Sequence, residues 1–254
     1  MGLWQTLRRR YVDRQPCPEE WKRILHSRIS QYRTMPSHYR NKLDQLVRYF
    51  MNEKSFEGCG GFDLDNEKKL IISALACIPL LGDVSNLYPN LRSVLVYPSD
   101  YRVSYSDYGY DGVVTEGVEH RSGESWDQGT LVFSWSEILY DLRHPLDGSN
   151  IVFHECAHQL DYEWGATMGT LSWRNNDKAN SRASGIKMAY EKLLSKIEKG
   201  QPVYVDGYAS TDVHEFFAVM TETWLEQPGI IRRHWPEMEE ILRGFYNFQP
   251  EALW

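Results

Sequence analysis

The residues of this chain whose types and spacing could do chemistry are His154, Glu155 and His158, in the segment HECAH. Histidines four positions apart lie on one face of a helix, so both imidazoles can bind a single Zn²⁺. The glutamate between them falls beside the metal, where it can deprotonate a zinc-bound water that attacks an amide. The residues around them, 151–160, are mostly apolar, and unpartnered histidines would be costly there. The pattern predicts a zinc helix with Glu155 as general base.

A catalytic zinc needs one more protein ligand and an open position for water. The extended pattern HExxHxxGxxH is excluded, because Asp161 and Trp164 occupy its glycine and last histidine positions. A later helix that carries a carboxylate is the other common solution. Glu215 and Glu222 stand seven apart, hence on nearly the same helix face, and His214 is a third candidate. The spacing alone leaves these three open.

The elements that must position these residues follow from periodicity and turn signals. The predicted helices before the middle of the chain are Pro18–Leu25, a helix capped by Ser37, and Glu67–Leu81, which Gly82 ends. The predicted strands are Arg92–Tyr97, Gly112–Glu119 and Gly129–Trp135. Asp147–Asn150 supplies a turn and an N-cap for the zinc helix. After a polar stretch from Gly165 to about Asn180, the predicted helices are Ser181–Lys199, Thr211–Glu226 and Pro236–Phe248.

These elements predict an α+β fold with a small mixed sheet, the HExxH helix beneath it and a helical N-terminal part. The 254 residues contain no repeat or linker, so we expect one catalytic domain over residues 1–254. Residues 1–90 are its mainly helical part and residues 91–254 its catalytic core. The four widely spaced cysteines predict neither a disulfide framework nor a thiolate zinc site.

The composition limits the partners of the chain. A formal net charge of -7 argues against nucleic acid as the main ligand, since a phosphate backbone favours basic surfaces. The sequence has no apolar run long enough for a signal peptide or a membrane span, so we expect a cytoplasmic protein without a membrane partner. Abundant aromatics, 9 Trp and 16 Tyr, suit a groove or a partner-facing surface.

Several segments, taken in order, resemble the Mlc titration factor A family of bacterial zinc peptidases. They are Phe56-Glu57-Gly58-Cys59-Gly60-Gly61, Leu95-Val96-Tyr97-Pro98, Trp126-Asp127-Gln128-Gly129, Ser134-Trp135, Arg143-His144-Pro145, Asp147-Gly148, the run from His154 to Asp161, and Glu215-Phe216-Phe217-Ala218. The match covers nearly the whole chain. HExxH alone is moderately specific, whereas this ordered set is highly specific.

The resemblance implies roles for two residues that spacing could not assign. It implies Glu215 as the third zinc ligand, which leaves Glu222 in a supporting or surface role. It also implies Tyr208 as a phenol donor to the oxyanion that forms when water attacks the amide. Cys156 departs from the family, where phenylalanine is frequent, and we expect it to face away from the metal. Asp161 could accept the free N–H of a ligand histidine or cap a helix.

The predicted activity is that of a zinc metallopeptidase of the gluzincin type, with His154, His158 and Glu215 as ligands. The resemblance implies aminopeptidase activity on peptides, although no residue is identified that would bind a substrate α-amine. It also implies, as an alternative of another class, a protein that sequesters a transcription repressor such as Mlc. Two further points stay open: whether the strand at Thr130–Trp135 borders the cleft and pairs with a peptide, and whether the aromatic C-terminal segment plugs the cleft or packs in the core.

Overall fold

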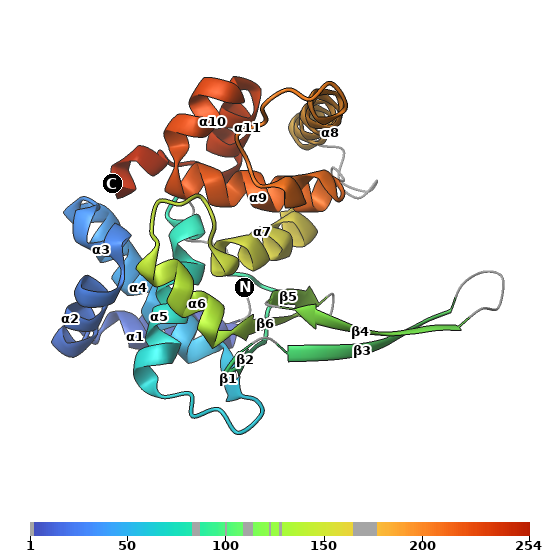
Figure 1. Ribbon diagram of the computed structural model, residues 1–254. Helices are drawn as coiled ribbons and strands as arrows, with labels where there is room; N and C mark the ends of the chain where they lie inside the picture. Colours follow the sequence, from blue (N-terminus) through green and yellow to red (C-terminus); the bar gives the residue numbers. More distant parts are fainter. Residues whose placement is uncertain are drawn as a thin grey trace.

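The computed structural model describes residues 3–82, 87–99, 101–108, 114–121, 123–126, 129–164 and 177–254, and their architecture is α+β (Figure 1). The described α-helices are α1 Leu3–Asp13, α2 Glu19–Arg28, α3 Ser30–Thr34, α4 Ser37–Glu53, α5 Asn66–Cys77, α6 Trp135–Arg143, α7 Ile151–Trp164, α8 Asp177–Glu198, α9 Val213–Glu226, α10 Pro228–His234 and α11 Pro236–Tyr246. Short 3-10 helices are η1 Ile78–Leu80, η2 Gly207–Ser210 and η3 Pro250–Leu253. The strands are β1 Ser55–Gly58, β2 Ser93–Tyr97, β3 Tyr101–Tyr108, β4 Val114–Arg121, β5 Gly123–Trp126 and β6 Thr130–Ser134.

Four of the strands form one mixed sheet in the order β1-β2-β6-β5. β1, β2 and β6 run parallel, with Ser93 opposite Ser55 and Thr130, whereas β5 runs antiparallel to β6. The expected mixed sheet is therefore confirmed. β6 lies between β2 and β5, so it has no free edge, whereas β1 and β5 are the two edge strands of this sheet in the described part of the chain. Among the described strands, β3 and β4 pair with each other alone, and they extend away from the helices as a long hairpin (Figure 1).

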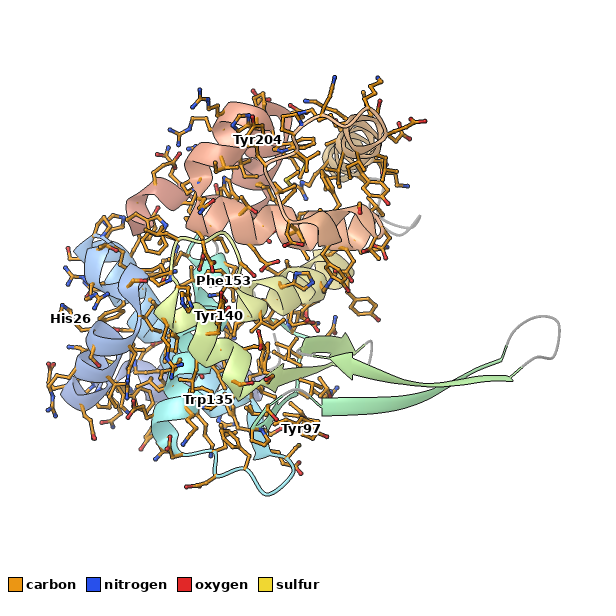
Figure 2. The ribbon with its side chains drawn as sticks, in the orientation of Figure 1. His26, Tyr97, Trp135, Tyr140, Phe153 and Tyr204 are labelled. Carbon is orange, nitrogen blue, oxygen red and sulfur yellow. The ribbon has the colours of Figure 1, made fainter. Side chains whose placement is uncertain are left out.

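Helix α7, which carries the HECAH segment, lies between the sheet and helix α9 (Figure 1). It packs on β5 and β6 from one side, on α9 from the other, and also against α5 and α6. Its apolar side chains fit this central place, since Val152, Phe153 and Leu160 are fully buried. Figure 2 shows Phe153 in the interior of the molecule, whereas His26 on α2 lies at the outer surface. A helix buried on several sides is a rigid support for a site.

Most of the predicted elements are confirmed, with shifted ends. Helix α5 and η1 cover the predicted Glu67–Leu81, and Asp65 caps α5 by accepting the backbone N–H of Lys68. The prediction that Ser37 caps a helix is wrong, because α4 already includes Ser37, follows Pro36 and has no side-chain cap. Sequence patterns missed the elements β1, β3, β5, α3, α6 and α10.

Parts of three predictions fall outside the described residues. They are Gly112 and Val113 of the second predicted strand, Asp127 and Gln128 of one family-like segment, and residues 165–176 of the polar stretch. Within the described part, the second strand is β4, and α8 begins at Asp177, before the predicted Ser181. The described helices include none that is both long and apolar enough to cross a membrane.

The aromatic C-terminal segment packs in the core. Trp224, Trp235 and Tyr246 are among the largest fully buried side chains, and Phe245 and Phe248 belong to the same hydrophobic cluster. The Trp224 ring stacks on Tyr246 at a centroid distance of 5.3 Å. Beyond them, the Trp254 indole N–H donates to the carbonyl of Leu225 at 3.0 Å, which ties the end of the chain to α9. Of the two alternatives left open by the sequence, a plug over the cleft or packing in the core, core packing accounts for these aromatic residues.

Candidate metal centre

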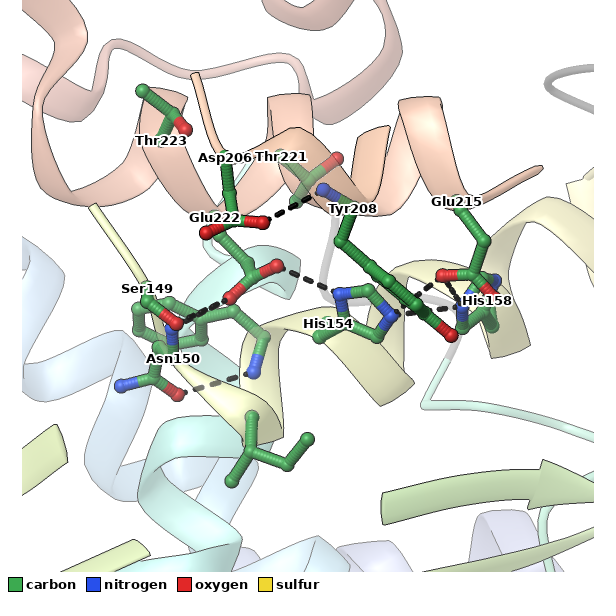
Figure 3. Close-up of polar contacts among 12 residues, drawn as sticks. Ser149, Asn150, His154, His158, Asp206, Tyr208, Glu215, Thr221, Glu222 and Thr223 are labelled. Carbon is green, nitrogen blue, oxygen red and sulfur yellow. Dashed lines mark hydrogen bonds and ion pairs between the residues drawn. The ribbon is translucent and has the colours of Figure 1, made fainter. Parts of the chain in front are cut away.

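The start of helix α7 fixes the direction in which its histidines point. Asn150 caps the helix, because its side-chain oxygen accepts the backbone N–H of Phe153 at 3.2 Å. One and two turns later, His154 and His158 lie one above the other, with ring centroids 4.7 Å apart. His154 is 7% exposed. The two imidazoles therefore share one face of α7, the face that meets α9 (Figure 3).

The start of helix α9 brings Glu215 to the same place. Asp212 caps this helix by accepting the backbone N–H groups of His214 at 2.7 Å and Glu215 at 3.0 Å. Glu215 therefore lies in the first turn, and its side chain reaches across to both histidines of α7 (Figure 3). The structure brings together the three residues predicted as ligands, although α7 and α9 are separated by about a fifth of the chain.

The three donor atoms form a compact triangle. Glu215 Oε2 lies 2.9 Å from His154 Nε2 and 3.2 Å from His158 Nε2, and the two Nε2 atoms are 3.1 Å apart. Metal bonds of about 2.05 Å at tetrahedral angles would place donors about 3.3 Å apart, so small adjustments admit a divalent ion. Two imidazole nitrogens and a carboxylate oxygen suit such an ion, and this group is the one found among the described residues as a possible metal site.

The charges at the triangle favour a cation. Burial would raise the pKa of Glu215, but hydrogen bonds from His154 and His158 outweigh burial and lower that pKa to about 2. For His154, burial lowers the pKa, but the hydrogen bonds to Glu215 and Glu222 outweigh burial and raise the pKa to about 10. In the metal-free protein the cluster therefore holds an ionised carboxylate and a proton on the histidine pair. A divalent metal would take the place of that proton.

Glu155 is buried beside the triangle, at 4% exposure. Burial is the main reason that its pKa rises to about 7, since His154 and His158 lower the pKa while Glu215 and Glu222 raise it. A carboxyl group with a pKa near neutrality can both take and return a proton. The environment of Glu155 thus suits proton transfer at the triangle.

Tyr208 reaches the triangle from the short helix η2. Asp206 holds the start of this helix by accepting the backbone N–H of Tyr208 at 2.7 Å. The Tyr208 ring lies 5.9 Å from the His154 ring, centroid to centroid, and its hydroxyl points toward His158 and Glu215 (Figure 3). The side chain is 54% exposed, so it lies on the solvent side of the site, where a substrate would enter.

His214 and Asp161, which the sequence left as candidates for the site, bind each other. Asp161 Oδ2 lies 2.7 Å from His214 Nδ1, and this pair joins α7 to α9. His214 is not part of the donor triangle. Cys156 is fully buried on the other side of α7, as expected, and all four cysteines are free.

Three acidic residues hold the start of α7; sequence patterns offered Glu222 as a candidate ligand or supporting residue but did not identify Asp141 and Glu226. Glu222 accepts the backbone N–H of Asn150 at 2.6 Å, Asp141 accepts that of Ile151 at 2.8 Å, and Glu226 accepts that of Gly148 at 3.2 Å. Burial is the largest cause that raises the pKa of Asp141 to about 7 and that of Glu226 to about 8. For Glu222 and Glu226 the available signal was the placement of acids within the apolar sequence of α9, whereas Asp141 lies on α6.

Comparisons with known proteins agree on one family. The family model of the glucose-regulated metallo-peptidase M90 matches residues 3–247. An uncharacterised protein of Synechocystis is 36% identical over 250 residues, which cover 97% of this chain and 90% of that protein. The Mlc titration factor A of Escherichia fergusonii is 29% identical over 231 residues, 89% of this chain and 83% of the relative. That of Cronobacter sakazakii is 28% identical over 211 residues, 82% and 79% of the two chains.

Proposed function

Because the chain belongs to the glucose-regulated metallo-peptidase family M90, we propose that it is a zinc-dependent peptidase of the gluzincin type. The observation that carries the proposal is the convergence of His154, His158 and Glu215 beside the buried Glu155. Two histidines and a glutamate are a ligand set of catalytic zinc sites, and they leave a fourth position for water or substrate. The proposed cofactor is one Zn²⁺ per chain.

The proposed reaction divides the work among five side chains. His154, His158 and Glu215 hold the metal, which when bound would polarise the scissile carbonyl and lower the pKa of a water molecule. Glu155 accepts the proton of the attacking water and passes it to the leaving amine. Tyr208 donates its hydroxyl proton in a hydrogen bond to the oxyanion.

We propose that the peptide substrate binds along the edge of strand β5. In the described part of the chain, β5 pairs with β6 on one side, and α7 packs against it. An extended peptide can add to such an edge through main-chain hydrogen bonds. This assigns to β5 the role that the sequence offered for the strand at Thr130–Trp135, since β6 has strands on both sides.

Purified protein incubated with a peptide library, with and without a chelator, tests the proposed activity. We expect cleavage that the chelator abolishes and that added Zn²⁺ restores, because the proposed mechanism needs the metal at every step. Cleavage that persists in the chelator, or no cleavage with Zn²⁺ supplied, would refute the proposal.

Aminopeptidase activity is the narrower form of the proposal, and it rests on the family resemblance. It predicts that peptides with a free α-amine are cleaved from the N-terminus, whereas the same peptides with an acetylated N-terminus are resistant. Mass spectrometry of the products distinguishes the two modes. Equal turnover of both peptide sets, with internal cleavage, would instead indicate an endopeptidase.

Replacement of Tyr208 by phenylalanine should lower kcat about 100-fold with little change in KM or in zinc affinity. The hydroxyl is proposed to act on the oxyanion, which forms only during the reaction, and loss of one such donor has effects of about this size. Tyr204→Phe is the matched control, since Tyr204 is similarly exposed, at 51%, but stacks on His234. If Tyr208→Phe retains the full kcat, the oxyanion role is wrong.

Zinc binding at pH 7 should release about one proton per ion, because a ligand histidine must be neutral. The raised pKa of His154 means that the metal-free protein keeps the proton through neutral pH, so zinc affinity should fall as pH falls. Calorimetry in two buffers of different ionisation enthalpy measures the released protons. A binding enthalpy independent of the buffer, together with an affinity independent of pH, would contradict this expectation.

A second candidate function is the capture of a transcription repressor. The observation that favours it is the name Mlc titration factor A, which several relatives carry. We propose that this chain binds an Mlc-like repressor and thereby affects the regulation of sugar uptake. A Glu155→Gln variant separates the two functions. If it captures the repressor and produces the full downstream response, binding is the biological role; if the response is lost while capture remains, catalysis is required.

We also propose that the chain forms one catalytic domain and acts in the cytoplasm. The buried residues support the first point, since one hydrophobic cluster includes Leu25 of α2, Val94 of β2, Phe153 of α7 and Leu253 of η3. Limited proteolysis tests it, because a single domain should yield no stable fragment that ends near residue 90.

A further inference from the structure

Helix α9 carries two buried carboxylates in addition to the partly buried Glu215. Glu222 and Glu226 follow Glu215 by 7 and 11 positions, which places all three on the side of α9 that faces α7. Glu222 is 5% exposed and Glu226 is 1% exposed. Buried carboxylates need hydrogen-bond partners, and the partners of these two residues differ in a way that separates their roles.

Glu222 uses its two oxygens on two different groups of α7. Oε1 lies 2.7 Å from His154 Nδ1, the ring nitrogen on the far side from the donor triangle. Oε2 accepts the backbone N–H of Asn150 at 2.6 Å and the hydroxyl of Ser149 at 3.3 Å. Figure 3 shows the carboxylate between the start of α7 and the His154 ring. The contacts at the start of the helix hold the carboxylate in place against the ring.

A carboxylate oxygen at this distance accepts a hydrogen bond, so Nδ1 of His154 carries the proton. The other nitrogen, Nε2, is directed at Glu215 and His158, so it is the nitrogen whose lone pair would bind a metal in the triangle once the proton that it shares with Glu215 is displaced. We propose that Glu222 is the positioning residue of the metal site, which fixes the tautomer and the ring orientation of His154. This inference rests on the proposed function of the triangle and adds a residue to it.

Glu226 provides a matched comparison on the same helix. Its Oε2 accepts the backbone N–H of Gly148 at 3.2 Å, and its Oε1 accepts the side-chain amide of Asn150 at 3.4 Å. Gly148 has φ of 92°, so this tight turn depends on its own residue type as well as on Glu226. Glu226 thus holds the same loop as Glu222, and its hydrogen bonds within the described residues go to this loop and not to a ligand histidine.

The test compares the zinc affinities of Glu222→Gln and Glu226→Gln by competition with a chromogenic chelator. Both substitutions remove one carboxylate from the same face of α9. The Glu222 carboxylate accepts hydrogen bonds from two N–H groups, the backbone N–H of Asn150 and the Nδ1–H of His154. A glutamine side chain has one oxygen, so one of these two N–H groups would face the amide NH₂ and lose its acceptor. We expect Glu222→Gln to bind Zn²⁺ about 10- to 100-fold more weakly than wild type, and Glu226→Gln to bind it as wild type does.

The outcomes separate this inference from the proposed function. Wild type that binds no zinc would refute the function, whereas wild type and Glu222→Gln with equal affinities would refute the role of Glu222 alone. Equal losses in both variants would assign the effect to the loop at the start of α7 and overturn the inference. If Glu222→Gln does not fold, as judged by circular dichroism, ¹⁵N NMR of zinc-bound wild type decides. We expect a protonated Nδ1 on His154, and metal on Nδ1 would contradict the inference.

Discussion

Replacement of Glu155 by glutamine is expected to lower kcat for peptide hydrolysis about 1,000-fold while zinc stays bound. The substitution keeps the size of the side chain but removes the group that accepts and returns a proton, and general acid–base catalysis contributes about this much. Glu155 is suited to the task because burial raises its pKa to about 7. Steady-state kinetics with a cleaved library peptide, together with metal analysis of the same samples, measures both effects.

A second acid-to-amide change on the same helix serves as the control. Glu163 lies two turns beyond Glu155 on α7, where it accepts the backbone N–H of Asn90 at 3.0 Å and the side-chain amide of Gln159 at 2.9 Å. Glu163→Gln should retain kcat, because it changes the charge of the helix away from the triangle. A Glu155→Gln variant that keeps the wild-type kcat would remove the proposed base from the mechanism.

Replacement of either His154 or Glu215 by alanine should weaken zinc binding by roughly 100-fold or more and lower the rate of catalysis with it. If a site of four ligands contributes about 12 kcal/mol, each ligand accounts for about 3 kcal/mol, or roughly a 100-fold loss of affinity. At Glu215 the loss should include the charge of the carboxylate, whose lowered pKa keeps it ionised. Competition with a chelator gives the affinities, and turnover at saturating Zn²⁺ shows whether any activity returns.

His214→Ala is the control for the ligand assignment. His214 adjoins Glu215 in the chain, but its ring binds Asp161 across the helix pair. We expect this variant to bind one Zn²⁺, with an effect limited to the contact between α7 and α9. Loss of zinc from His214→Ala and retention by Glu215→Ala would transfer the third-ligand role to the histidine.

The parts of the site that sequence could predict are those within one helix. A spacing of four residues predicts that His154 and His158 lie on one face of a helix. In the structure the two rings do lie next to each other on α7. Asn150 was expected near an N-cap and caps α7. Glu215 and Glu222 could not be told apart by spacing, because both point toward α7. Glu215 contacts Nε2 of the His154 ring and Glu222 contacts Nδ1 of the same ring. This difference depends on the position of each residue along α9.

The remaining parts depend on contacts between distant segments. Asp141 and Glu226 bind the backbone at the start of α7, but the polar residue types alone suggest surface positions. The edge strand β5 has only four residues, too few for alternation to predict it, and its place is set by pairing with β6. The aromatic C-terminal segment was ambiguous because the same residue types fill cores and cover clefts. Tertiary packing decides such cases.

Titration of the metal-depleted protein with Zn²⁺, with peptide cleavage measured at each step, tests the central claim most directly. If His154, His158 and Glu215 form the catalytic zinc site, cleavage should rise in proportion to bound zinc and stop rising at one ion per chain. Cleavage before any zinc is added, or none when one Zn²⁺ is bound per chain, would contradict the account.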